Sequence, residues 1–279
     1  MKWLFALILA CGIFGGAYYF ASRVLFKQEI AVRQEKRSDF VPEPTPDASL
    51  PEFEAVAQIR QQGDLNATRE ALISFIQKFP GSSRVEDART MLGEVNTDIL
   101  LNPVPSPDKQ EYTVRSGDVL AKIANKMKST PELIMRTNNL TGTMLHIGDK
   151  LYIAHPDFSL FIQTNAKAVV LANHSQFFKR YYIREVKLPP KPAARITTKV
   201  AEVMAWKQGK RIGFGTKEYA NSTRWVRLAA PGFTLYAMPD SSHPDVDEPP
   251  PPTGLGLAAS DLQELSSLVN GKTPATITE

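Results

Sequence analysis

Apolar and polar positions follow three successive patterns along the chain. Between residues 52 and 100, apolar side chains recur at helical spacing, and Gly63 and Pro80 interrupt the recurrence. Residues 111–154 begin and end with alternating stretches that enclose two short helical ones. From Phe158 onward alternating stretches dominate, before one late helical stretch. These patterns predict an α+β protein with several domains.

Residues 52–100 predict three helices that pack on one another. The first ends at Gly63, the second ends before Pro80, and Ser82 or Ser83 can cap the third. This helix–glycine–helix–proline unit resembles a single tetratricopeptide-like hairpin with one extra helix. Such repeats need about three copies to bury their apolar faces, so we interpret the unit as a small spacer or docking unit.

A long apolar stretch lies at the N-terminus. Residues 3–21 carry no charge and, at about 1.5 Å per residue, almost cross a hydrocarbon core; residues 24–26 extend the stretch. A small-residue cleavage site is poorly defined. We therefore predict that residues 1–26 form a transmembrane helix, an uncleaved signal that serves as a membrane anchor; the alternative is a signal peptide that is removed.

The basic excess of the chain lies beside this stretch. The chain has 33 Lys and Arg against 29 Asp and Glu, and residues 1–37 alone account for the net charge of +4. The remaining residues are balanced, which favours membrane contact and argues against nucleic-acid binding. By the positive-inside rule, Arg23, Lys27 and Arg33 outweigh Lys2 and place the body in the cytoplasm.

Cys11 is the only cysteine of the chain. It excludes an intrachain disulfide and a cysteine metal site. The stretch that ends at Cys11 loosely resembles a lipoprotein processing site, where the cysteine would take a lipid. The short leader and the apolar continuation favour the alternative, a small residue inside a spanning helix.

Many of the prolines gather in two places. Residues 38–51 and 101–110 are rich in proline and predict stiff linkers. They separate the anchor from the helical unit, and the helical unit from residues 111–154.

Residues 111–154 predict a βααβ unit with two helices on one face of a two-stranded antiparallel sheet. Its motifs are Tyr-Thr-Val-x-x-Gly-Asp at 112–118, Ile-Ala at 123–124, Asn-Asn-Leu at 138–140 and Ile-Gly-Asp-x-Leu-Tyr-Ile at 147–153. In this order they resemble the LysM domain family. LysM domains bind N-acetylglucosamine-containing glycans, which are peptidoglycan in bacteria and chitin elsewhere.

The resemblance implies a shallow groove between the first strand–helix loop and the second helix–strand loop. The residues that it assigns to glycan binding are Ser116, Gly117, Asp118 and Val119 in the first loop and Asn139, Leu140, Thr141, Gly142, Thr143, Met144 and Leu145 in the second. Backbone polar groups can orient an acetamido sugar, while Met144 or Val119 packs its methyl group. For Asp118 and the Asn pair, helix capping is an equal alternative.

Residues 158–279 predict a β-rich domain. Strands at 159–162 and 168–171 are expected to form a hairpin, and further strands are expected at 177–183 and 224–228. Several stretches resemble the L,D-transpeptidase catalytic domain, which cross-links peptidoglycan through a cysteine thioester. They are residues 177–181, 196–200, 209–215, 224–228, 254–261 and 271–277.

The chain departs from this family at the catalytic positions. Aligned on Asp261, Pro252 takes the place of the histidine, Thr253 that of the glycine and Gly254 that of the cysteine, and the upstream histidine falls near Tyr236. Without a thiolate no thioester can form, so we interpret the domain as non-catalytic and expect no catalytic residue.

The histidines offer little chemistry. His174 and His243 do not occupy the family's positions, and His146 lies before a turn, so we expect surface or structural roles and no metal site. Ser241 and Ser242 beside His243 suggest a serine nucleophile, but adjacency in sequence is poor support for catalytic geometry.

The C-terminal domain has two oppositely charged segments. Residues 160–230 carry fourteen Lys and Arg against three Glu, a balance of +11, and residues 231–279 carry Lys272 against seven acidic residues, a balance of −6. We expect the two segments to neutralise each other when packed. The alternative is a basic face for an anionic wall polymer or lipid headgroups.

The sequence therefore predicts a membrane-anchored, non-catalytic, peptidoglycan-binding protein of the bacterial envelope. The wall-binding modules favour a single-pass protein with its body in the periplasm or cell-wall space, against the positive-inside rule. We expect no cofactor, and envelope proteins are possible further partners. Two alternatives stay open: a peptidoglycan-remodelling enzyme with a relocated nucleophile, and a protein–protein adaptor that acts through residues 52–100.

Overall fold

The described part of the chain begins after the predicted anchor. The computed structural model describes residues 47–106, 108–190, 193–244, 246, 250–251 and 253–279. The predicted anchor at 1–26, Cys11 and most of the linker at 38–51 lie outside the described residues. Within them, no helix is both long and apolar enough to span a bilayer. Residues Ser49–Glu279 form one compact unit.

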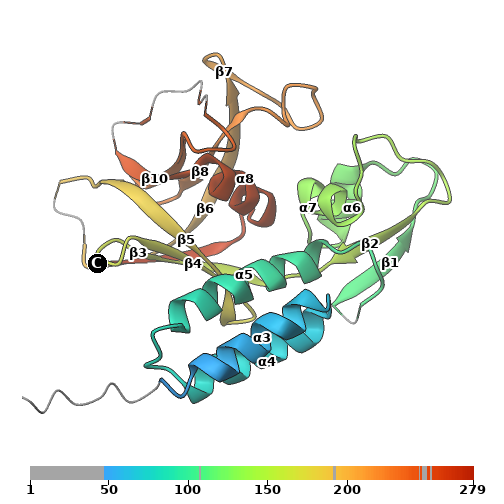
Figure 1. The fold of residues 1–279 in the computed structure, drawn as a ribbon. Coiled ribbons are helices and arrows are strands. Elements are labelled where there is room, and N and C mark those ends of the chain that lie inside the picture. Colours follow the sequence, from blue (N-terminus) through green and yellow to red (C-terminus); the bar gives the residue numbers. More distant parts are fainter. Residues whose placement is uncertain (1–46, 107, 191–192, 245, 247–249, 252) are drawn as a thin grey trace, which may run out of the picture. The chain divides into compact units, whose positions relative to one another are not determined.

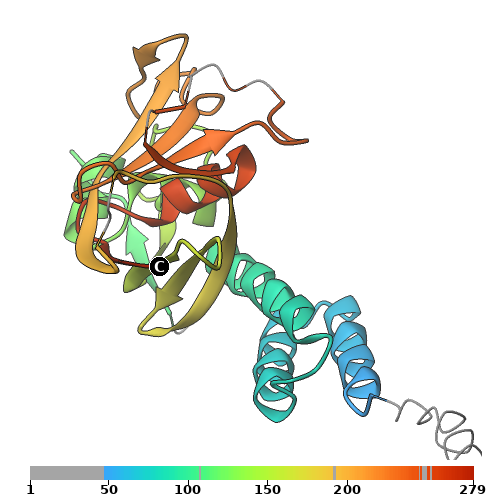
Figure 2. The same ribbon diagram turned by 90° about the vertical axis from the view of Figure 1, so that its left-hand side faces the viewer.

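Three helices, α3 (Leu50–Gln61), α4 (Leu65–Lys78) and α5 (Val85–Leu101), begin this unit, as the apolar spacing predicts (Figures 1 and 2). Asp64 caps α4, because its side chain accepts a 2.9 Å hydrogen bond from Ala67 N. The predicted serine cap of α5 is wrong: its N-cap is Arg84, without a side-chain capping bond, and Ser82 Oγ accepts a 3.0 Å hydrogen bond from Arg84 N before the helix begins. Phe75 and Leu92 lie in a common core.

Helix α5 packs against a strand of the C-terminal domain, β5 (Gln176–Lys187). Gly93 permits this approach, since a Cβ at that position would lie 3.3 Å from the Cα of Lys179. Beside it, Asn96 Nδ2 donates a 2.8 Å hydrogen bond to Phe178 O. The helical unit is therefore held by the C-terminal domain, and partner binding through it stays a prediction.

The βααβ unit forms in the predicted order. Its elements are β1 (Lys109–Thr113), α6 (Leu120–Lys126), α7 (Pro131–Thr137) and β2 (Lys150–Ala154). The strands pair antiparallel, with Tyr112 opposite Leu151. Both residues are buried together with Ile123 and Ile134 from the two helices. The two short helices thus cover one face of the small sheet.

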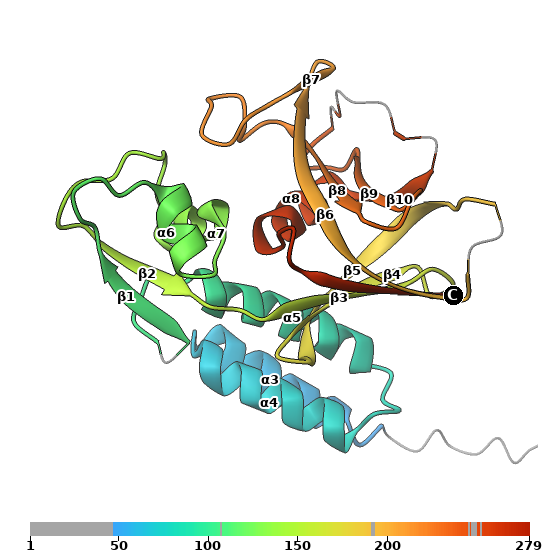
Figure 3. The same cartoon turned by 180° about the vertical axis from the view of Figure 1, so that it is seen from behind.

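The C-terminal domain is a closed barrel rather than an open sheet (Figure 3). Its other elements are β3 (Phe158–Gln163), β4 (Ala168–Asn173), β6 (Arg195–Lys207), β7 (Lys210–Arg211), β8 (Thr223–Leu228), β9 (Thr234–Met238), β10 (Gly254–Ala258), α8 (Ala259–Leu268) and β11 (Pro274–Thr278). The nine-stranded sheet has the order β11-β3-β4-β5-β10-β9-β8-β6-β7. Strand β11 pairs parallel with β3 and antiparallel with β6, which closes the barrel.

Helix α8 packs against β8, β9 and β10 and joins the two charged segments. Its Glu264 lies 2.7 Å from Lys179 Nζ on β5 and accepts a 2.8 Å hydrogen bond from the Tyr181 hydroxyl. Burial, reinforced by Glu264, raises the pKa of Tyr181 well above its ordinary value. One ion pair thus links the basic and acidic segments here, and their wider neutralisation stays a prediction.

The LysM-like unit also packs against the barrel. Thr130 Oγ1 donates a 2.7 Å hydrogen bond to Ser267 O, and Arg136 Nη1 donates one of 2.6 Å to Ser267 Oγ. Leu133 on α7 joins the core of the barrel, whereas its neighbour Ile134 joins the core of the βααβ unit. Two adjacent apolar residues of α7 are thus buried in two different hydrophobic cores, which the pattern of apolar residues in the sequence does not predict.

Candidate functional site

Two loops meet at one end of the small sheet. The first loop (residues 114–119) leaves β1 and the second loop (residues 138–149) enters β2, at the end where Thr113 pairs with Lys150. Backbone hydrogen bonds of 2.9 Å join them: Val114 N donates to Asp149 O, and Gly148 N donates to Val114 O. The bases of the two loops are therefore joined at this end of the sheet, and glycan binding by the predicted residues stays a prediction.

Asp118 braces the first loop. Its Oδ2 accepts hydrogen bonds from Arg115 N at 2.9 Å and from the Tyr112 hydroxyl at 2.7 Å. These two bonds, the backbone one first, lower the pKa of the Asp118 carboxyl. The alternative that Asp118 caps α6 is wrong: the N-cap residue is Val119, and no side chain makes a capping hydrogen bond there. The carboxylate turns back toward the strand because Gly117, with φ +81°, reverses the chain before it.

Asn138 and Asn139 have different roles in the second loop. Asn138 Nδ2 donates to Ile134 O and Tyr152 O, and its Oδ1 accepts from Tyr152 N at 2.7 Å, which ties α7 to β2. Asn139 is exposed and lies in the left-handed region, with φ +52°. The capping alternative therefore holds for Asn138, which is the C-cap of α7, whereas Asn139 is left exposed in the second loop.

Exposed apolar side chains border the loops. Met144 is 79% exposed, Ile147 is 74% exposed and Val119 is 50% exposed. Ile147 was not among the predicted groove residues, since the sequence placed it in a turn motif; its exposure is visible only in the fold. Leu140 and Leu145 instead pack against the core of the βααβ unit. The remaining predicted residues, Ser116, Gly117, Thr141, Gly142 and Thr143, are exposed.

Two of the positions that align with the catalytic residues of transpeptidases, Gly254 and Tyr236, are closely packed against their neighbours. Gly254 has φ +152°, and a Cβ there would lie 2.4 Å from Thr234 O and 3.1 Å from the Tyr236 ring. Tyr236 is fully buried, and its hydroxyl donates a 2.5 Å hydrogen bond to Glu185. Burial and that bond raise the pKa of Tyr236. Pro252 lies outside the described residues.

Ser241 and Ser242 do not form a nucleophile–base pair with His243 among the described residues. Asp240 Oδ1 accepts hydrogen bonds from Ser242 N at 2.9 Å and from His243 N at 2.8 Å, so the segment is a turn around Asp240. His243 Nδ1 is buried without a hydrogen-bond partner among the described residues. A serine hydroxyl that donates to His243 is therefore not part of the described geometry.

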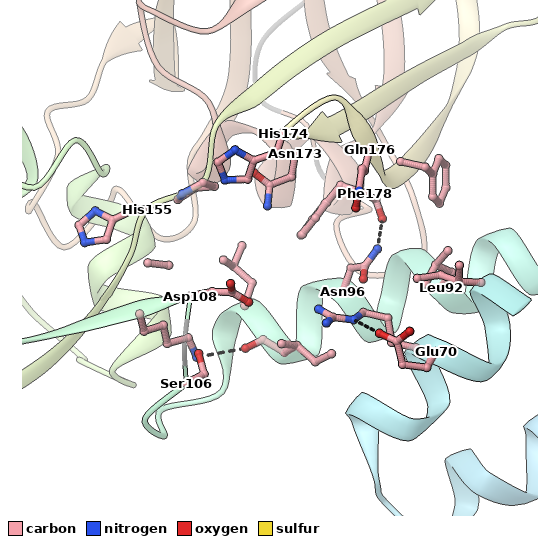
Figure 4. A pocket seen from close by; sticks show the side chains of 18 of the residues that line it. Glu70, Leu92, Asn96, Ser106, Asp108, His155, Asn173, His174, Gln176 and Phe178 are labelled. Carbon is pink, nitrogen blue, oxygen red and sulfur yellow. Dashed lines mark hydrogen bonds and ion pairs between the residues drawn. The ribbon is translucent and has the colours of Figure 1, made fainter.

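A polar cleft of about 550 Å³ lies where α4 and α5 face the strand ends of the two sheets (Figure 4). His155 and His174 line it together with Asp108 and Glu70. His155 Nδ1 lies 2.7 Å from Met127 O, which occupies one nitrogen of that ring. Among the described residues, no three histidine or acidic side chains are grouped closely enough to hold a metal ion.

Residues 112–154 match the model of the LysM domain family. The match spans the βααβ unit, with both loops and the exposed side chains that border them. The predicted LysM domain is thus confirmed. No curated protein matches the chain.

The solved structures that resemble the chain include L,D-transpeptidases. One from Mycobacterium smegmatis is 12% identical with a TM-score of 0.31, over 48% of this chain and 65% of that chain. One from Mycobacterium tuberculosis is 12% identical with a TM-score of 0.30, over 61% and 90%. A cysteine-to-serine mutant from Enterococcus faecium is 12% identical with a TM-score of 0.29, over 43% and 49%. The chain thus covers less than two thirds of the first and third of these.

Proposed function

We propose that this chain is a peptidoglycan-binding protein of the bacterial envelope, which holds N-acetylglucosamine-containing glycan between the first and second loops. The match of residues 112–154 to the LysM family carries this proposal. The geometry supports it, because the fold brings both predicted loops to one end of the sheet and leaves Met144 and Val119 exposed there.

The chemistry of the groove suits an acetamido sugar. The sugar offers an amide N–H, a carbonyl oxygen and a methyl group, and exposed loop backbone and apolar side chains complement all three. One shallow groove binds weakly, because few contacts offset the cost of ordering the ligand. We therefore expect binding that is measurable on polymeric peptidoglycan and weak on a short oligosaccharide.

Sedimentation with peptidoglycan sacculi tests the proposal. The detergent-solubilised full chain is expected to co-sediment, and Met144→Asp is expected to weaken binding about tenfold, because it puts a charge against the acetamido methyl group. Phe161→Asp is the matched control, since Phe161 is 41% exposed on β3, away from the loops. No enrichment of the wild-type chain over an unrelated protein would reject the function.

We also propose that the barrel does not catalyse peptidoglycan cross-linking. The close contacts of Gly254 with Thr234 O and the Tyr236 ring support this, since they leave no room for a reactive side chain at the aligned position. Mass spectrometry of muropeptides incubated with the full chain is the test. We expect an unchanged muropeptide profile; a new cross-link or a cleaved product would establish an enzyme.

The anchor and its orientation complete the proposal. Residues 1–26 would hold the chain in the membrane with its body in the periplasm or cell-wall space, where peptidoglycan is. The uncharged stretch at 3–21 supports this arrangement. Protease added to intact spheroplasts is expected to digest the body; full protection until lysis would place it in the cytoplasm.

A further inference from the structure

A second cleft, of about 690 Å³, lies between α7 and α8. Its walls include Arg136 and Asn139 from the LysM domain and Phe214, Tyr219, Arg224 and His243 from the barrel domain. Asn139 also belongs to the second glycan loop. In addition, a Cβ at Gly215 would lie 3.2 Å from Thr143 Cγ2, so the segment between β7 and β8 touches that loop. The cleft therefore lies beside the second loop.

Arg224 forms the floor of this cleft. Its side chain is 2% exposed, and its Nε and Nη1 lie buried without a hydrogen-bond partner among the described residues. The Tyr219 ring lies 3.6 Å from its Cζ, and Glu132 Oε1 lies 3.5 Å from its Nη2. Glu132 also accepts a 2.8 Å hydrogen bond from the Tyr219 hydroxyl. One shared carboxylate therefore leaves this buried guanidinium incompletely paired.

The other charged groups of the cleft differ in how they are paired. Glu264 is paired with Lys179 at 2.7 Å, so its charge is already balanced. Arg136 Nη1 donates a 2.6 Å hydrogen bond to the neutral hydroxyl of Ser267, and Arg136 has no ion pair among the described residues. On the opposite wall, His243 Nδ1 lies 3.7 Å from Asp240 Oδ1. Among the side chains that line the cleft, Arg136 and Arg224 are therefore accompanied by a single carboxylate without a lysine partner, Glu132, and a carboxylate ligand would balance the two arginines.

We propose that this cleft binds a carboxylate group carried by the same wall polymer whose sugar occupies the LysM loops. In peptidoglycan, carboxylates belong to the short peptides attached to alternate sugars, so the cleft would take a peptide arm of the bound strand. Phe214, 37% exposed beside Tyr219, would cover its apolar part. The inference rests on the proposed function.

The test compares soluble glycan strands that carry peptides with the same strands after an amidase has removed the peptides. The detergent-solubilised full chain is expected to bind the peptide-bearing strands about tenfold more tightly, as one charged hydrogen bond allows. Arg224→Gln and Arg136→Gln are expected to abolish that preference and to leave binding of bare strands unchanged. Arg227→Gln is the matched control, since Arg227 lies exposed on the same strand as Arg224 and pairs with Glu202 at 3.3 Å.

The outcomes separate the two proposals. Equal wild-type affinity for the two kinds of strand, or an undiminished preference in Arg136→Gln, would overturn this inference and leave glycan binding standing. Failure to bind either kind of strand would overturn the proposed function itself. Thermal unfolding of each variant shows whether Arg224→Gln folds. If Arg224→Gln does not fold, the Arg136→Gln variant tests the inference, because Arg136 is partly exposed.

Discussion

At Asp118, two hydrogen bonds converge on one carboxylate oxygen. The donors, Arg115 N and the Tyr112 hydroxyl, join the first loop to the end of β1. The loop is thereby fixed by a residue that the sequence assigned either to helix capping or to the ligand. Gly254 is the contrasting case, where the absence of a side chain lets the Tyr236 ring pack against the backbone.

Asp118→Asn is expected to lower the melting temperature at neutral pH, because an amide is a weaker acceptor than a carboxylate. The folded pKa of Asp118 is lowered, so its contribution to stability is present above the unfolded value of about 3.9 and is lost as the pH falls through the folded value. The difference in melting temperature between wild type and variant should therefore shrink between pH 6 and pH 3. A difference that stays constant over this range would contradict the assignment.

Gly254→Ala is expected to lower the free energy of unfolding by about 2 to 4 kcal/mol, through backbone strain and the clash with Thr234 O. Gly213→Ala is the control, since a Cβ there meets nothing within 4 Å. Urea unfolding measures both. A neutral Gly254→Ala would show that the position has room for a side chain after all, and would reopen the question of catalysis.

Among the elements, α7 is connected both to the LysM domain and to the barrel. Asn138 joins its C-terminal end to β2, Thr130 at its N-terminal end bonds Ser267, and Leu133 enters the barrel core. This seven-residue helix therefore supports the second loop, which follows it directly.

Asn138→Ala is expected to destabilise the protein by about 1 to 3 kcal/mol, because it leaves Tyr152 N without its partner. Asn139→Gly should be close to neutral, since the residue has φ +52°, which glycine adopts readily. Chemical denaturation of the two neighbouring variants checks the contrast. Equal losses would contradict the division of roles between the two residues.

Local elements follow from the sequence, whereas their long-range pairing does not. The helices of residues 50–101 and the hairpin of β3 and β4 lie where spacing and alternation predict them. Barrel closure depends on Ala275 pairing with both Leu160 and Thr198, and no local pattern encodes such contacts. Within the candidate site, the loops were predictable from their motifs, but the neighbouring Arg224 was not, because its burial arises from packing between domains.

In the whole molecule, the LysM domain and the barrel share apolar contacts. Leu133 of α7 and Leu100 of α5 both lie in the core cluster of the barrel. The helical unit, the LysM domain and the barrel should therefore unfold together rather than as separate modules.

Leu133→Ala is expected to destabilise this joint structure by about 2 to 4 kcal/mol, because Leu133 is 1% exposed. Leu145→Ala, at a partly buried position on the edge of the LysM core, should cost less. Calorimetry should show a single unfolding transition for the wild type, which shifts to lower temperature in Leu133→Ala. Two transitions, of which only one moves, would mean that the domains unfold independently.

The pairing of β11 with β3 has a consequence for biosynthesis. Ala275 lies beside Leu160, so more than a hundred residues must leave the ribosome after β3 before its partner exists. Until then β3 and β6 each have one edge with unpaired backbone amide and carbonyl groups, which can pair with strands of other chains. A newly made chain would be most prone to aggregate in this interval, and a holding chaperone would be of most use then.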